Sequence, residues 1–100
     1  MKTWQMVWVY HFSFMDEIQF RSTDPQAETL IVNAAREIVP ECGYTHNPES
    51  REGGRIHHLN KRGYAVQWRI LTRLGQDGWE PFAVDNSVIF LRKEQVSAAD

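Results

Sequence analysis

The N-terminal stretch of the chain carries an alternation that is apolar on both of its sides. Every even position from 4 to 14 holds a large apolar residue, namely Trp4, Met6, Trp8, Tyr10, Phe12 and Phe14. A period of two predicts a β-strand, because successive side chains of a strand point to opposite faces. Val7 and Val9 make the odd face apolar as well. One layer of helices covers only one face of a sheet, so this strand requires a second cover.

A helix is predicted after this strand. Thr23-Asp24-Pro25 combines capping residues with a proline suited to the first helical position. Apolar residues then recur at spacings of three and four: Ala27, Leu30, Ile31, Ala34, Ala35 and Ile38. This spacing predicts an amphipathic helix of about four turns that ends before Pro40.

The segment from Glu41 to Asn60 shows no periodicity and is rich in turn formers and charges. We expect a long loop there, at about residues 41–60. Long unstructured connections are uncommon in a compact domain and are usually functional or mobile. The segment is therefore the first place to look for a binding site.

A second helix is predicted from Lys61 or Tyr64 to Gln76. Its apolar side is expected to consist of Trp68, Ile70, Leu71 and Leu74. Gly78 suits the left-handed residue that follows a helix, which would place Trp79 so that it folds back on the last turn.

Two short apolar segments, at 82–84 and 88–91, flank Asp85-Asn86-Ser87 and predict a tight hairpin. The residues 94–100 are small or polar and are expected to be frayed. The fold class is therefore α+β: a small three- to four-stranded antiparallel sheet with two helices packed on one face. A chain of 100 residues has room for a single domain, spanning 1–100.

The composition excludes several classes of protein. A formal charge of -2 and a pI near 6.1 argue against dedicated nucleic-acid binding, which usually needs a basic domain. The single cysteine, Cys42, cannot form an internal disulfide. The N-terminal segment lacks the continuous apolar core of a signal peptide or a membrane span. We therefore expect a cytoplasmic protein that does not bind membranes.

The C-terminal third resembles a known family. The segment from Ile70 to Lys93 contains L-G-x-x-G-W-E followed by a hairpin that ends in I-F-x-x-K, and the N-terminal strand contains Trp4 and Tyr10. These features are similar to a family of small bacterial and phage proteins known only as a domain of unknown function, the DUF4177 type. The resemblance implies a small antiparallel sheet with helices on one face, and it supplies no enzymatic motif. Typical members are shorter, whereas this chain inserts Asp24 to Asn60.

Residue types suited to catalysis or metal binding are present without a clear pattern. Cys42 and His46 have a C-x3-H spacing that zinc could use, but the adjacent His57 and His58 would diverge on a strand. No serine lies in a G-x-S-x-G elbow, and Gly53-Gly54 lacks the rest of a phosphate-binding loop. We expect no metal, no cofactor and no enzymatic activity. The simplest interpretation is that Cys42 is a buried thiol and that the histidines face solvent.

Basic and aromatic residues gather around the start of the second helix. Arg62, Arg69 and Arg73 would lie along one helical stripe, and such guanidinium groups beside aromatic rings suit phosphates and stacked bases. The candidate ligand-binding residues are Arg55, His57, His58, Arg62, Tyr64, Trp68, Arg69 and Arg73. The alternative is that these arginines are ordinary solvated charges of a helix.

Two functions remain open. The first is a non-enzymatic homo-oligomer that binds a small nucleotide-like anionic ligand, in outline like the phage proteins that sequester defence-signalling nucleotides. Its interface is expected to bury Trp4, Trp8 and Tyr10, or else Val7 and Val9. The second is a protein–protein interaction module, or an inhibitor of a host enzyme, that acts through the aromatic strand or the long loop.

Overall fold

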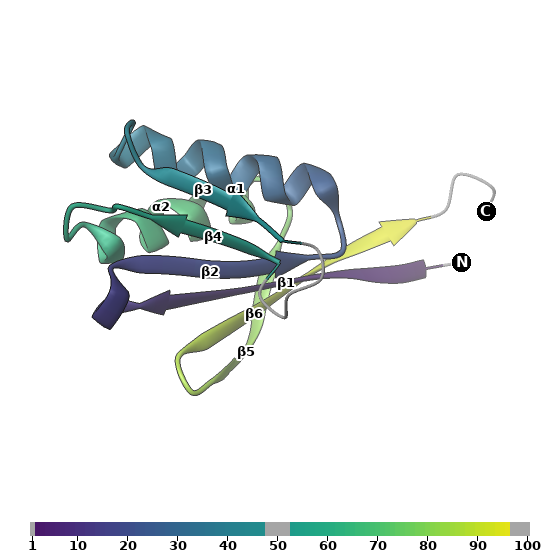
Figure 1. Ribbon diagram of the computed structural model, residues 1–100. Coiled ribbons are helices and arrows are strands. Elements are labelled where there is room, and N and C mark those ends of the chain that lie inside the picture. Colours follow the sequence, from purple (N-terminus) through teal and green to yellow (C-terminus); the bar gives the residue numbers. More distant parts are fainter. Residues whose placement is uncertain (1, 48–52, 97–100) are drawn as a thin grey trace.

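The computed structural model describes residues 2–47 and 53–96, which form one six-stranded antiparallel sheet with two helices on one face (Figure 1). The strand order is β3-β4-β2-β1-β6-β5. The elements are β1 (Lys2–Phe12), a 3-10 turn (Ser13–Met15), β2 (Glu17–Ser22), α1 (Pro25–Ile38), β3 (Gly43–His46), β4 (Gly54–His57), α2 (Gly63–Gln76), β5 (Glu80–Asp85) and β6 (Val88–Val96). The predicted α+β class is confirmed, whereas three to four strands were too few.

β1 lies inside the sheet, between β2 and β6. Its odd-numbered Val7 and Val9 point towards the helices and are buried. Its even-numbered residues point to the opposite face, so the predicted alternation is confirmed. The strand ends at Phe12 rather than Phe14, because Ser13–Met15 forms a 3-10 turn that closes with Asp16 in the left-handed region, at φ 52°.

The core lies between the helix-bearing face of the sheet and the two helices. Ile18 and Phe20 of β2, which sequence analysis did not assign to a strand, are fully buried there. The other fully buried large side chains include Ile31, Ile56, Ile70, Leu74 and Leu91. The core therefore joins strands and helices that are distant in sequence. Among the described residues, no helix is both long enough and apolar enough to span a membrane.

Helix α1 begins and ends where the sequence predicts. The Asp24 carboxylate accepts a hydrogen bond from the Gln26 backbone N–H at 3.0 Å, and Pro25 occupies the first turn. The helix ends at Ile38, two residues before Pro40. A side-chain cap thus fixes the start of this helix, and Pro40 prevents its continuation.

Helix α2 also ends as predicted. Gly78 has φ 95°, and the Trp79 backbone N–H donates to the Leu74 carbonyl at 2.9 Å. The Trp79 ring is buried. The predicted apolar side is wrong at one position, because Trp68 is exposed and Val66 occupies a buried position instead. Val66 lies one turn before Ile70 on the same side of the helix, and this side faces the sheet.

The expected loop at 41–60 is wrong at residues 43–46 and 54–57, which form strands. Its described residues include β3 and β4, which pair with each other and extend the sheet beyond β2. Gly54 lies against the ring of Phe20, and a Cβ there would come within 2.6 Å of that ring. The glycine that suggests a flexible loop is therefore required by close packing inside a strand. Residues 48–52 of the expected loop lie outside the described residues.

The C-terminal hairpin is confirmed and is longer than predicted. Asn86 and Ser87 both have positive φ, at 50° and 68°, as a two-residue turn between right-twisted strands requires. β6 continues to Val96 by pairing with the start of β1. Residues 94–96 are therefore strand rather than frayed tail, since β1 offers them backbone partners, and residues 97–100 lie outside the described residues.

Two alanine substitutions test whether β4 belongs to the packed sheet. Gly54→Ala should reduce the free energy of unfolding by about 1–3 kcal/mol, because the added methyl group meets the buried ring of Phe20. Gly75→Ala is the matched control: a Cβ at this position of helix α2 would meet nothing within 4 Å, so the change should be neutral or raise stability by up to about 1 kcal/mol. Urea unfolding measures the change in the free energy of unfolding for both variants. Equal effects would contradict the placement of β4.

Candidate functional site

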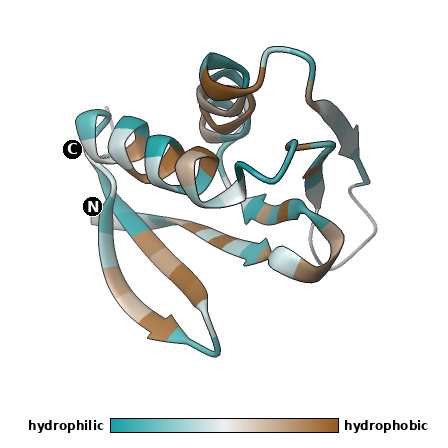
Figure 2. Cartoon of the chain, turned by 90° about the vertical axis from the view of Figure 1, so that its left-hand side faces the viewer, coloured by the Kyte–Doolittle hydropathy of each residue, from teal (hydrophilic) through white to brown (hydrophobic). Residues whose placement is uncertain are grey.

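The face of the sheet that carries no helix holds a row of aromatic residues that are exposed or half-buried. We define this aromatic face by Trp4, Met6, Trp8, Tyr10 and Phe12 of β1, Phe82 of β5 and Phe90 of β6. Trp4 is 51% exposed, and Met6 and Phe82 are also exposed. Figure 2 shows the apolar residues of the β5–β6 hairpin extending away from the helices. The face is larger than the three residues predicted for the interface.

Arg92 organises one end of the aromatic face. Its guanidinium lies 4.5 Å from the ring centroid of Trp4 and 5.3 Å from that of Phe82. Its Nε also donates to the Glu80 carboxylate at 2.8 Å. These contacts hold the two rings in place at one end of the sheet. A hollow of about 190 Å³ lies further along the face, lined by Met6 and Trp8 of β1, Arg21 and Ser22 of β2, and Phe90 of β6.

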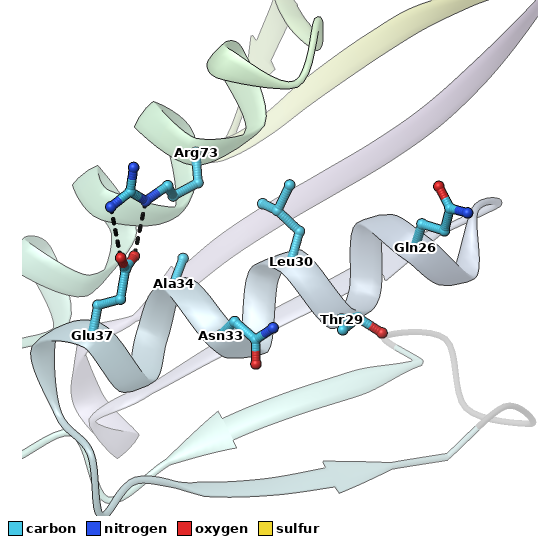
Figure 3. A pocket seen from close by; sticks show the side chains of 7 residues that line it. All are labelled: Gln26, Thr29, Leu30, Asn33, Ala34, Glu37 and Arg73. Carbon is cyan, nitrogen blue, oxygen red and sulfur yellow. Dashed lines mark hydrogen bonds and ion pairs between the residues drawn. The ribbon is translucent and has the colours of Figure 1, made fainter.

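The predicted cluster of arginines is divided between different parts of the molecule. Arg73 binds Glu37 of α1 with two hydrogen bonds, at 2.9 and 2.6 Å (Figure 3). Arg69 lies 3.7 Å from the same carboxylate. These bonds hold the pKa of Glu37 below its usual value and raise the pKa of Arg73. Arg69 and Arg73 therefore join α2 to α1, which leaves less of their charge for an anionic ligand.

The other basic residues are also separated. Arg62 precedes α2, and its guanidinium donates to the Ile38 carbonyl at 3.0 Å. Arg55 lies on the sheet with its Nε 3.8 Å from the carboxylate of Glu17. His57 lies on the same strand as Arg55, and its Nε2 is 3.0 Å from the hydroxyl oxygen of Thr45. His58 follows the strand with φ 61°. Arg73 and Tyr64 line two different cavities, so these two predicted ligand residues are not neighbours in one site.

A groove of about 420 Å³ runs along α1 beside the end of α2 (Figure 3). Leu30 and Ala34 form its apolar floor, while Asn33 and Thr29 supply polar groups at its edge. Its charged residues, Glu37 and Arg73, already neutralise each other. The groove therefore offers little charge to a ligand.

Tyr64 and Trp68 lie one helical turn apart on α2, and both are exposed, at 75% and 74%. They occupy a different flank of the helix from Arg69 and Arg73, as their spacing along the helix requires. Tyr64 also lines a pocket of about 400 Å³ between α2 and the C-terminal hairpin. We call it the α2–hairpin pocket and define it by Tyr10, His11, Ser13, Tyr64, Gln67, Val84, Ser87 and Ile89.

His11 is the functional candidate that sequence analysis missed. Its ring meets that of Tyr64 edge to face, with centroids 4.6 Å apart. Gly63 lies directly against the imidazole and leaves no room for a Cβ. Burial lowers the pKa of His11, and the nearby Asp16 partly opposes that effect. In the sequence, His11 could have been recognised as a titratable residue among the apolar ones on the inward side of β1.

The residues considered for zinc do not form a site. Cys42 is buried, and burial raises the pKa of its thiol. His46 contacts Tyr44 and lies 3.6 Å from the carboxylate of Glu28. Within residues 2–47 and 53–96, no three histidine, cysteine or acidic side chains are grouped as metal ligands.

Comparisons of the chain with models of known protein families, with curated proteins and with solved structures found no match. The resemblance to the domain of unknown function stays a prediction.

The pKa of His11 predicts a specific response of stability to acid. A histidine whose pKa is lowered by folding resists a proton that the unfolded chain accepts, so stability falls as the pH drops below the usual value of 6.5. Between about pH 7.5 and 5.5 the wild-type protein should lose more stability than His11→Gln, which has no titratable ring. Urea unfolding at both pH values measures this difference. The same loss in both proteins would show that folding does not shift the pKa of His11.

Proposed function

We propose that this protein is a non-enzymatic binding protein that works as a two-fold homodimer joined through the aromatic face. The observation that carries the proposal is that β1 is apolar on both sides while both helices pack on one side. A second copy would supply the missing cover. The interface would include Trp4, Trp8 and Tyr10, whereas Val7 and Val9 already belong to the core.

The amount of apolar surface supports a protein partner. Trp4, Met6 and Phe82 all remain exposed, and Trp8, Tyr10, Phe12 and Phe90 retain part of their surface. Each Å² of apolar surface that a partner removes from water contributes about 25 cal/mol of favourable free energy. Contiguous apolar patches of more than a few hundred Å² are uncommon on monomeric proteins and usually mark contact surfaces.

The distribution of charge favours a second copy as that partner. On one side of β1, the strands β2 and β4 place Arg21, Arg55 and Glu17 on this face, where Glu17 pairs with Arg55 and leaves this half with one more basic than acidic residue. On the other side, β5 and β6 place Glu80 and Glu94 there, together with Arg92, which pairs with Glu80. A two-fold axis parallel to β1 would put the acidic half of each copy over the basic half of the other. Two stacked sheets would thus pair opposite charges around an aromatic centre.

An anionic ligand bound by the predicted basic cluster has less support. Arg69 and Arg73 share the carboxylate of Glu37, and Arg62 donates to a backbone carbonyl. Recruiting these cations would break the contacts that join the two helices. We therefore place binding on the aromatic face rather than on the arginine stripe.

A contact with a different protein is the second candidate. Phe14 is 96% exposed, and Met15 beside it is also exposed, at the turn between β1 and β2. This turn is held by Asp16, whose carboxylate accepts a hydrogen bond from the Lys61 backbone N–H at 3.1 Å. A rigid apolar tip of this kind suits insertion into a partner's pocket. A photo-crosslinking amino acid in place of Phe14 tests this candidate. If the partner is a different protein, the crosslinked product should have a mass that differs from that of two copies of this chain.

A charge placed on the aromatic face should separate the dimer. Trp4→Glu should produce a folded monomer, because the new carboxylate can pair with Arg92 in the monomer but would be buried in the interface. Trp68→Glu is the matched control, since it alters another exposed tryptophan on α2 and should leave the dimer intact. Light scattering gives the mass and circular dichroism checks the fold. A folded wild-type monomer at high protein concentration would contradict the proposal.

A further inference from the structure

The α2–hairpin pocket has the size and the walls of a small-molecule site. Its volume of about 400 Å³ falls within the usual range of ligand pockets, about 300–1,000 Å³. One wall comes from the first turns of α2, through Tyr64 and Gln67. The opposite wall comes from the C-terminal hairpin, through Val84 and Ile89. The two walls belong to different segments of the chain, so the pocket exists only in the folded protein.

The aromatic side of the pocket is held in place before any ligand arrives. Gly63 allows the imidazole of His11 to lie against the first turn of α2. The ring of Tyr64 then meets this imidazole edge to face, at an interplanar angle of 83°. Two rings fixed in this way offer a preorganised surface to another flat ring.

The polar groups of the pocket are uncharged near neutral pH. Ser13, Gln67 and Ser87 carry hydroxyl and amide groups that can both donate and accept hydrogen bonds. Burial lowers the pKa of His11, so its neutral ring presents one donor and one acceptor. No carboxylate, lysine or arginine side chain lines the pocket in the described part of the chain. A charged ligand would lose its hydration there without gaining a counter-charge.

We propose that the α2–hairpin pocket binds a small uncharged molecule with a planar heterocyclic ring, packed against Tyr64 and hydrogen-bonded by the neutral groups around it. This inference goes beyond the proposed function. The pocket lies on the helix-bearing side of the hairpin, and of its lining residues only Tyr10 also belongs to the aromatic face. Ligand binding and dimer formation would therefore share Tyr10 and otherwise depend on different residues.

Adenosine, uridine and nicotinamide are suitable probes, since each is uncharged and carries a planar heterocycle. Adenosine monophosphate supplies a charged comparison. Titration of the isotope-labelled protein should shift the amide signals of the pocket residues, such as Gln67 and Ser87, with at least one uncharged probe. Tyr64→Ala should weaken that binding at least tenfold. Trp68→Ala is the matched control and should leave it unchanged, because Trp68 is equally exposed on the same helix but does not line the pocket.

Three results would overturn this inference. The first is the absence of shifts in the pocket with all three uncharged probes at millimolar concentration. The second is an equal loss of binding in Tyr64→Ala and Trp68→Ala, which would indicate stacking on any exposed ring. The third is tighter binding of adenosine monophosphate than of adenosine. The Trp4→Glu monomer should still bind the probe, so failure of the dimer and failure of the pocket are distinguishable.

Discussion

The structure depends on a single strand that supplies two apolar surfaces. β1 pairs with β2 and β6, and its inward residues Val7 and Val9 are fully buried beneath the helices. The same backbone alternation forces Trp4, Met6 and Trp8 to the opposite side. The alternation that supplies the core therefore also places the aromatic face on the other side of the sheet. The two helices cover one side of β1, and a second copy is our proposed cover for the other.

The second helix packs on the sheet through Val66, Ile70 and Leu74, and it also contacts α1 through ion pairs. Glu37 of α1 holds Arg73 and Arg69 of α2, so this flank of α2 is committed to the neighbouring helix. The other flank is left to Tyr64 and Gln67, which border the α2–hairpin pocket. The charges that resemble a binding site in the sequence thus serve the packing of two helices. Among the described residues, no carboxylate, lysine or arginine side chain lines that pocket.

The sequence predicts those parts of the fold whose signals are local. Asp24 and Pro25 mark the start of α1, and Gly78 marks the end of α2, because caps and positive φ values require particular residue types. β4 could not be predicted in this way. It contains Gly54, whose role appears only when the ring of Phe20, which is distant in sequence, packs against it. Strand pairing over such distances is decided by tertiary contacts.

The candidate site was predictable to a similar extent. The apolar row of β1 follows directly from its period of two, so the aromatic face was visible in the sequence. The grouping of Arg69 with Tyr64 was not correct, because residues five apart on a helix lie on different flanks. His11 could be found only in the structure, since its neighbours Gly63 and Tyr64 lie far away along the chain.

The most direct test of the central claim is whether the aromatic face contacts another copy in solution. Isotope-filtered nuclear Overhauser spectroscopy, on a mixture of labelled and unlabelled protein, records contacts between copies. The methyl group of Met6 lies on the aromatic face, whereas that of Met15 lies on the exposed turn and serves as an internal control. The account predicts contacts from the Met6 methyl group to aromatic rings of the other copy, and none from Met15. A folded sample in which Met6 shows no contact between copies would contradict it.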